Sequence, residues 1–152
     1  MNIVELLERD AELLVAEATE AVLRDKLSHY EVTGREATKK RVRKLFELLQ
    51  ECIAKQTAAP MVAHSRVIAE ERWASGFDLQ EVQTAFNVLE EAVWKRILAE
   101  LEPAEYAQAL GRVSTVLGLG KDALARSYVS LATRTRVPSL DLKTLFEGAP
   151  AS

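Results

Sequence analysis

The fold of this 152-residue chain is decided by residues 67–94, VIAEERWASGFDLQEVQTAFNVLEEAVW. The segment has the pattern of two helices joined at a tight corner. Gly76 is the residue type that ends a helix in the left-handed conformation. Asp78 and Glu81 have the spacing of a capping box at the start of the next helix, and the apolar residues around this cap have the spacing of a hydrophobic staple. Together these signals predict one αα corner.

Helical periodicity extends from this corner toward both ends of the chain. Apolar residues repeat every three or four positions and predict helices over residues 2–28, 33–57, 60–76, 79–101 and 104–132. Thr33 and Glu36 suggest a second capping box, and Pro60 suits the first turn of a helix. No segment alternates at period two, as a strand would. The expected fold is all-α, an antiparallel helical bundle of four to five helices with short capped loops.

The chain is long enough for one domain with one full core. We expect residues 1–132 to form the helical bundle and residues 133–152 to form a C-terminal linker or tail. The apolar positions that face inward in the predicted helices should make up the core. They are Leu7, Leu14, Leu45, Phe46, Leu49, Ile68, Val82, Phe86, Leu89, Val93, Leu110, Val113 and Leu117.

Composition indicates a soluble protein. Apolar residues make up 48% and charged residues 28%, which is ordinary for a globular domain. The net charge of -3 gives no general attraction to nucleic acid or to anionic membranes. The acidic, amphipathic N-terminus lacks the pattern of a secretory signal, and no apolar run approaches the length of a membrane span. We therefore expect a cytoplasmic protein with no nucleic-acid partner and no membrane span.

The sequence contains no recognisable catalytic, cofactor-binding or metal-binding cluster. With two histidines and a single cysteine, Cys52, it lacks the short-spaced ligands of a zinc site and can form no intramolecular disulfide. A di-iron bundle needs Glu-x-x-His pairs, but Met61 stands three residues before His64. Residues 118–123 match the G-x-G-x-x-A dinucleotide pattern by accident, because a helix and not a strand precedes them. We expect no enzyme activity.

His64 raises one alternative, a histidine phosphotransfer protein. Such proteins are helical bundles with one exposed histidine, usually followed by Lys at the third position and Gly at the fourth. Here Val67 and Ile68 occupy those positions, and Ser65 replaces the acid that follows the histidine in kinase dimerisation helices. The pattern favours an ordinary helix-surface histidine.

Three further features bear on binding. The basic run from Arg35 to Lys44 has no interleaved aromatic residue, so it favours a solvated helix face or a docking face for an acidic partner. Gly118 and Gly120 should mark a kink or a close helix approach, and the missing side chains suggest a small apolar pocket for a sensed ligand. We expect Trp94 to be partly exposed, as at a homodimer interface.

The Gly76–Phe77 corner and the stretch from Leu89 to Trp94 resemble the N-terminal helical domain of the RsbR/RsbRD-type RsbT co-antagonists, which also precedes some bacterial histidine kinases. The similarity is clearest over residues 62–97. It implies an all-helical input domain that regulates a bound or attached signalling protein, either a kinase or a STAS-type regulator. Because no β-rich STAS segment follows residue 132, we expect a free-standing module or a fragment of a longer protein.

The leading hypothesis is therefore a non-enzymatic regulatory or sensor module that acts through protein–protein contacts in bacterial signalling. Phosphotransfer through His64 and sensing of a small apolar ligand are the alternatives.

Overall fold

The computed structural model describes residues 1–25 and 34–136 and confirms the all-α antiparallel bundle. Within this part of the chain there are six helices and no strand, whereas the sequence predicted four to five helices. The helices are α1 (Ile3–Arg9), α2 (Ala11–Arg24), α4 (Arg35–Lys55), α5 (Ala59–Ala74), α6 (Leu79–Glu100) and α7 (Pro103–Arg136).

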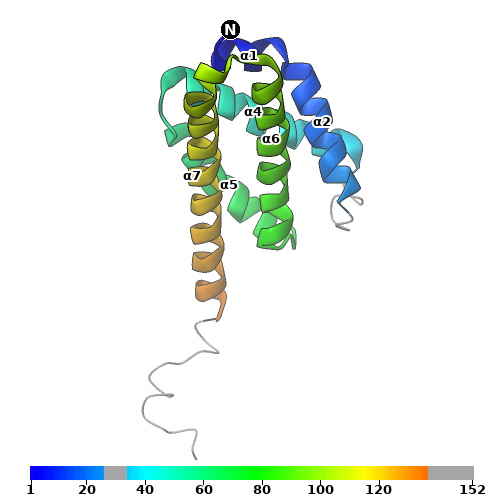
Figure 1. The fold of residues 1–152 in the computed structure, drawn as a ribbon. Helices are drawn as coiled ribbons and strands as arrows, with labels where there is room; N and C mark the ends of the chain where they lie inside the picture. Colours follow the sequence, from blue (N-terminus) through cyan, green and yellow to red (C-terminus); the bar gives the residue numbers. More distant parts are fainter. Residues whose placement is uncertain (26–33, 137–152) are drawn as a thin grey trace, which may run out of the picture.

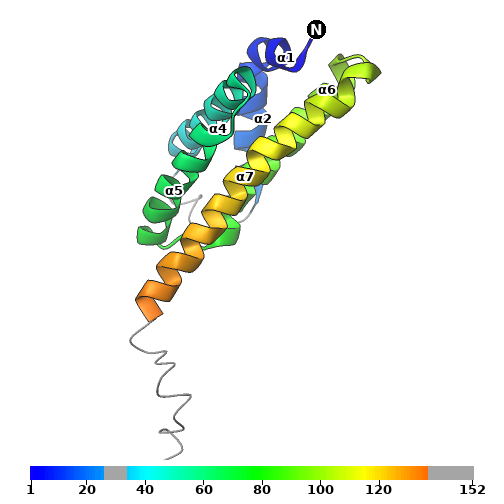
Figure 2. The ribbon, with the colours of Figure 1, turned by 90° about the vertical axis from the view of Figure 1, so that its left-hand side faces the viewer.

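The five longer helices form a ring in which α2 packs on α4, α4 on α5, α5 on α7, α7 on α6, and α6 on α2. The short helix α1 lies across one end of this ring, against α4 and α6 (Figure 1). The longest helix, α7, runs along the whole bundle and extends past the other helices at the opposite end (Figure 2). This arrangement encloses one apolar core.

The core contains nearly all of the residues predicted for it. Leu14, Leu49, Leu89 and Leu117 are fully buried, and Phe46 and Phe86 are among the largest fully buried side chains. Ile68 and Leu110 are the two exceptions, because each is only partly buried and packs against the edge of the core. Both exceptions border surfaces described below.

The corner between α5 and α6 forms as the sequence predicts. Gly76 has φ 84°, and its N–H and that of Phe77 donate to the carbonyls of Trp73 (3.1 Å) and Arg72 (2.9 Å), which is the Schellman pattern. The Asp78 carboxylate accepts from the Glu81 N–H at 2.8 Å, and the Glu81 carboxylate accepts from the Asp78 N–H at 3.1 Å. The capping box is therefore complete.

Side chains from other helices hold this corner in place. Phe77 is buried, and its carbonyl accepts a hydrogen bond from the Tyr128 hydroxyl of α7 at 2.9 Å. The Tyr128 ring also makes a T-shaped contact with Trp73, with ring centroids 5.6 Å apart. The corner is thus tied to the far half of α7, 51 residues along the chain.

The predicted first helix, residues 2–28, is wrong because it breaks at Asp10 into α1 and α2. Helix α2 ends at Arg24, and predicted residues 26–28 lie outside the described residues. The buried Asp10 carboxylate pairs with Arg9 (2.8 Å) and with Arg96 of α6 (3.1 Å). The break lets α1 turn across the end of the bundle and bury Ile3, Leu6 and Leu7. Helical periodicity alone does not show a bend of this kind, because the residues on both sides of the bend keep the helical spacing of apolar residues.

Helix boundaries farther along the chain also differ from the prediction. Helix α4 begins at Arg35 with Gly34 as its N-cap and no side-chain cap, whereas the predicted capping box began at Thr33, which lies outside the described residues. Helix α7 continues to Arg136, so residues 133–136 are helical and not part of an extended linker. The remainder of the predicted tail, residues 137–152, lies outside the described residues.

Gly118 and Gly120 of α7 have different surroundings, and neither interrupts the helix. A Cβ added to Gly120 would lie 2.8 Å from Met61 Cγ, 3.0 Å from Phe86 Cε2 and 3.2 Å from Ser65 Oγ. A Cβ added to Gly118 would meet nothing within 4 Å. Gly120 therefore marks a close approach of α5 and α6 to α7, and the space predicted beside it for a ligand is filled by these side chains.

We predict that the corner is a stability element. Asp78→Ala should lower the free energy of unfolding by about 1 kcal/mol, because the cap is lost. Phe77→Ala should lower it by about 3 kcal/mol, because the ring is buried. Gly76→Val should cost more than Asp78→Ala, because a β-branched residue resists positive φ. Urea denaturation measures all three, and a Phe77→Ala protein that unfolds at the wild-type urea concentration would contradict the prediction.

Gly118 and Gly120 supply a matched pair of substitutions. Gly118→Ala should raise the free energy of unfolding by about 1 kcal/mol, because alanine has the higher helix propensity and the site is open. Gly120→Ala should lower it, because the new methyl group overlaps packed side chains and overpacking costs about 1–3 kcal/mol. Thermal melts of the two variants should shift in opposite directions, and shifts of the same sign would be the contrary result.

Candidate functional site

A basic pocket opens between α4, α5 and α6 on the described part of the chain. It has a volume of about 480 Å³, within the range of small-molecule sites. Cationic side chains from α4 and α5 share its wall with apolar side chains from all three helices. The lining residues are Ala37, Lys40, Arg41, Lys44, Leu45, His64, Ile68, Glu71, Arg72, Val82, Ala85 and Phe86.

The two arginines of the basic pocket are held by the corner. The Arg72 guanidinium lies 5.1 Å from the centroid of the Phe77 ring, and the Arg41 guanidinium lies 5.9 Å from it. Cation–π contacts of this kind fix the position of a guanidinium without using up its N–H donors. Arg72 Nη1 is buried and has no hydrogen-bond partner among the described residues.

His64 lies in the wall of the basic pocket and is partly buried. Burial lowers the pKa of its imidazole, and the nearby charge of Lys44 lowers it further, while Glu71 acts in the opposite direction. The structure thus places the predicted phospho-acceptor beside lysine and arginine side chains in a pocket wall rather than on an open helix surface.

The basic run from Arg35 to Lys44 divides between two faces of α4. Arg35 forms an ion pair with Glu20 of α2, and Arg43 binds Glu12 of α2 through two hydrogen bonds of 2.7 and 2.9 Å. These residues join neighbouring helices. Lys40, Arg41 and Lys44 face the other side and line the basic pocket. The run is therefore neither a uniformly solvated face nor a single docking face.

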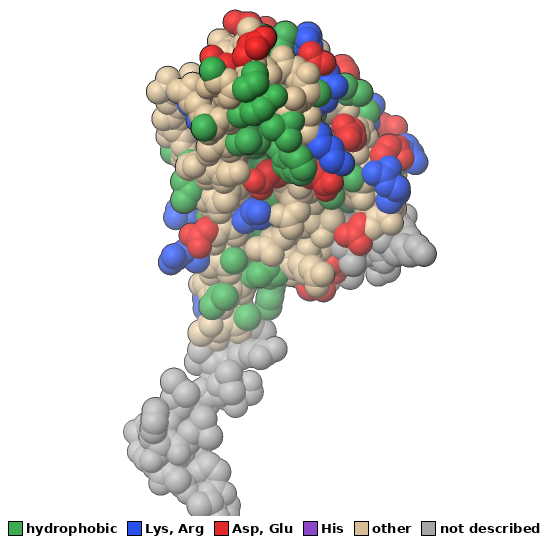
Figure 3. All heavy atoms as spheres, viewed as in Figure 1, with side chains coloured by type: hydrophobic (Ala, Val, Ile, Leu, Met, Phe, Trp, Pro, Cys, Tyr) green, Lys and Arg blue, Asp and Glu red, His purple; other side chains and the backbone are tan. Residues whose placement is uncertain are grey.

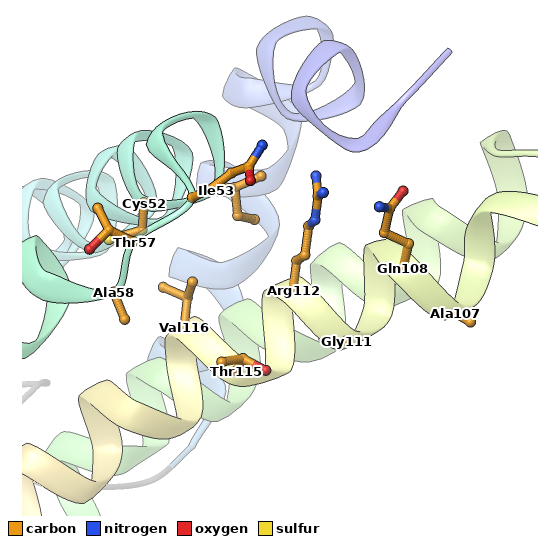
Figure 4. Close-up of a pocket in the computed structure, with 11 residues that line it drawn as sticks. Cys52, Ile53, Thr57, Ala58, Ala107, Gln108, Gly111, Arg112, Thr115 and Val116 are labelled. Carbon is orange, nitrogen blue, oxygen red and sulfur yellow. The ribbon is translucent and has the colours of Figure 1, made fainter.

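A second cavity of about 370 Å³ lies between the C-terminal end of α4 and the first half of α7. Figure 4 shows Gln108 and Arg112 extending from α7 toward this end of α4. Cys52 lines it but is buried, and burial raises the pKa of the thiol. A thiol with a raised pKa is a poor nucleophile. Neither Gly118 nor Gly120 lines this cavity or the basic pocket.

An apolar face lies across α6 and α7, and Figure 3 shows it as a patch near the end of the bundle covered by α1. We define it by Trp94, Leu98, Tyr106 and Leu110. Trp94 and Leu98 are 39% and 42% exposed, as the sequence predicted for Trp94. The Tyr106 hydroxyl donates to the Leu98 carbonyl at 2.9 Å, so the two helices meet here.

Polar contacts border this apolar face farther along the same two helices. The Ser114 hydroxyl donates to the Glu90 carboxylate at 2.8 Å, and Lys121 Nζ donates to Asn87 Oδ1 at 2.9 Å. An apolar centre with aromatic residues and a polar rim is typical of protein–protein interfaces.

Within residues 1–25 and 34–136, no group of three or more His, Cys, Asp or Glu side chains is placed to hold a metal ion. None of the helices described combines the length and the apolar character that crossing a membrane requires.

The sequence prediction missed Arg72, which is central to the basic pocket. A signal was present, because His64, Ile68 and Arg72 are spaced by four and therefore lie on one face of α5. All three line the basic pocket. What the sequence does not show is that this face of α5 meets Lys40 and Lys44 of α4.

Comparison with known proteins identifies one family. Residues 11–136 match the family described as the RsbT co-antagonist protein rsbRD N-terminal domain, which covers all of the bundle except α1. No curated protein and no solved structure matches the chain.

The position of His64 predicts how stability depends on pH. Its pKa is lowered on folding from the ordinary value of about 6.5, so the unfolded chain binds the proton more tightly. The free energy of unfolding should therefore fall as the pH drops through about 6.5. At pH 8 the imidazole is neutral in both states, so this loss of stability should be absent there. In His64→Gln the fall between pH 7 and pH 5 should be smaller.

Urea denaturation of the wild-type protein and of His64→Gln at several pH values measures this difference. Contributions from the carboxylates are common to both proteins and cancel. Parallel curves for the two proteins would show that His64 titrates alike in the folded and unfolded states.

Proposed function

We infer that this chain, which belongs to the RsbRD N-terminal domain family of RsbT co-antagonist proteins, is a regulatory module of bacterial signalling. The finer proposal is that it is not an enzyme and that it acts by binding another signalling protein. By family, the candidate partners are a switch kinase of the RsbT kind and a STAS-type regulator. The observation that carries this proposal is the apolar face on α6 and α7.

The apolar face has the features of a site for a protein partner. Trp94 and Leu98 are four residues apart on α6, so their side chains lie next to one another. Tyrosine and tryptophan are enriched among the residues that dominate binding energy, and they lose little conformational entropy when buried. Packing of the core does not depend on the exposed parts of Trp94 and Leu98, because Val93 and Ile97 form the buried side of α6 here.

Helix α7 is suited to pass on a change made at this surface. It packs against α5 and α6 over much of its length and continues as one helix to Arg136. A rigid helix moves as a unit, so a displacement at Tyr106 would also move the end of α7. We propose that partner binding and the position of α7 are linked in this way.

Phosphotransfer through His64 remains the second candidate, and the structure favours it less. Its imidazole lies in a pocket wall among lysine and arginine side chains, where its pKa is lowered. Incubation with a phosphorylated response regulator tests it, since acid-labile phosphate on wild-type protein but not on His64→Gln would support this candidate.

We predict that Trp94→Asp lowers the affinity for the partner by at least tenfold, because a carboxylate would be buried at the centre of the contact. The free energy of unfolding should change little, because the Trp94 side chain is 39% exposed. Calorimetric titration with the switch kinase and the STAS-type regulators of the source cell measures the affinity.

Val67→Asp is the matched control, because Val67 is 50% exposed and lies on α5. It introduces the same charge at an exposed apolar residue away from the apolar face. Equal losses for the two variants, or full binding by Trp94→Asp, would rule out the apolar face as the contact. Sedimentation of the protein alone shows whether a second copy of the chain occupies this face instead.

A further inference from the structure

Cationic side chains outnumber anionic ones in the lining of the basic pocket. Lys40, Lys44 and Arg72 line it, and Glu71 is the one carboxylate among the lining residues. Glu71 lies 3.8 Å from Arg72 Nη2, and its side chain is 60% exposed while that of Arg72 is 12% exposed. The acid therefore sits toward solvent, and the guanidinium lies deeper.

Arg72 has donor capacity left over. Nη1 is buried and has no hydrogen-bond partner among the described residues, and leaving a buried charged donor unsatisfied is costly. The guanidinium is held against Phe77 at 5.1 Å, so it does not need to be reordered when a ligand arrives. A fixed guanidinium with free donors is the usual partner of a carboxylate or phosphate group.

The rest of the wall is apolar. Leu45, Val82 and Phe86 are buried core residues, and Ile68 and Ala85 are partly buried hydrophobic residues packed against the core. Inorganic anions gain nothing from such a surface, whereas an alkyl or aryl group is stabilised by removing it from water. The volume of about 480 Å³ leaves room for an apolar group of about ten carbon atoms in addition to an anionic head.

We propose that the basic pocket binds a small amphipathic anion, with its anionic head on Arg72, Lys40 and Lys44 and its apolar part against Ile68, Ala85 and Phe86. This inference goes beyond the proposed function and does not depend on it. The basic pocket and the apolar face lie on different faces of α6, because the mean direction of residues 82, 85 and 86 around the helix axis is more than a quarter turn from the mean direction of residues 94 and 98.

Three probes separate the two parts of the ligand. Decanoate, below its micelle concentration, has both an anionic head and an apolar chain. Decanol has only the chain, and inorganic phosphate has only the charge. Calorimetric titration should show that decanoate binds at least tenfold more tightly than either of the others. Equal binding of decanol, or of phosphate, would overturn the proposal, because one of the two parts would then contribute nothing.

Variants locate the binding site. Arg72→Gln should weaken decanoate binding about tenfold, the value of one charge-assisted hydrogen bond of about 1.4 kcal/mol. Because Arg72 also contacts Phe77, Lys44→Gln and Ala85→Leu provide tests that leave the corner intact. The first removes a cation from the wall, and the second fills apolar space.

Lys55→Gln is the matched control for charge. Lys55 is also on α4, is 65% exposed and pairs only with Glu51 among the contacts described. Weakening by Lys44→Gln and Ala85→Leu, with wild-type affinity in Lys55→Gln, would support the site. The same loss in Lys55→Gln as in Lys44→Gln, or unchanged affinity in Ala85→Leu, would overturn it.

The imidazole of His64 reports the position of the anionic head. An anion within a few ångströms favours the protonated ring and raises its pKa. In an NMR titration, decanoate should raise the pKa of His64 and decanol should not. A pKa that is unchanged by saturating decanoate would place the head group elsewhere and would overturn the proposed orientation.

Discussion

The corner at Gly76 to Asp78 is the constraint on which much of this structure depends. Its backbone is fixed locally by a Schellman motif and a capping box. Phe77 then connects it to the rest of the fold, because its carbonyl accepts from Tyr128 of α7 and its ring contacts the guanidinium groups of Arg72 and Arg41. One residue thus links the α5–α6 turn, the far half of α7, and the two arginines of the basic pocket.

Local signals predicted the fold well. Caps, prolines and apolar spacing are properties of neighbouring residues, and they gave the α5–α6 corner and most helix boundaries. The break at Asp10 was missed, and one partner of the Asp10 carboxylate is a distant residue, Arg96 of α6. Burial of an ion pair between helices has no signature in the periodicity of either helix.

The core prediction failed only at Ile68 and Leu110, and both failures are informative. Each occupies an inward-facing position by periodicity, yet each is partly buried. Ile68 lines the basic pocket, and Leu110 belongs to the apolar face. At both positions the periodicity of the sequence predicts a buried apolar residue, and the bundle leaves it partly exposed. Positions where local sequence signals and the fold differ in this way are expected at functional sites. The candidate surfaces could not be predicted because each is assembled from separate helices.

Helix α6 connects these two surfaces physically. Phe86 lines the basic pocket, and its ring edge lies 3.0 Å from the point where a Cβ of Gly120 would be. On another side of the same helix, Trp94 and Leu98 form the apolar face with Tyr106 and Leu110 of α7.

A ligand against Phe86 changes the apolar face only if it binds one arrangement of α6 on α7 better than another. Side chains fill the contact at Gly120, so small graded shifts of α7 against α6 are costly there. Packed interfaces of this kind instead move between discrete arrangements. Coupling between the two surfaces would therefore act through the α6–α7 contact at Gly120 as a two-state change in the position of α7.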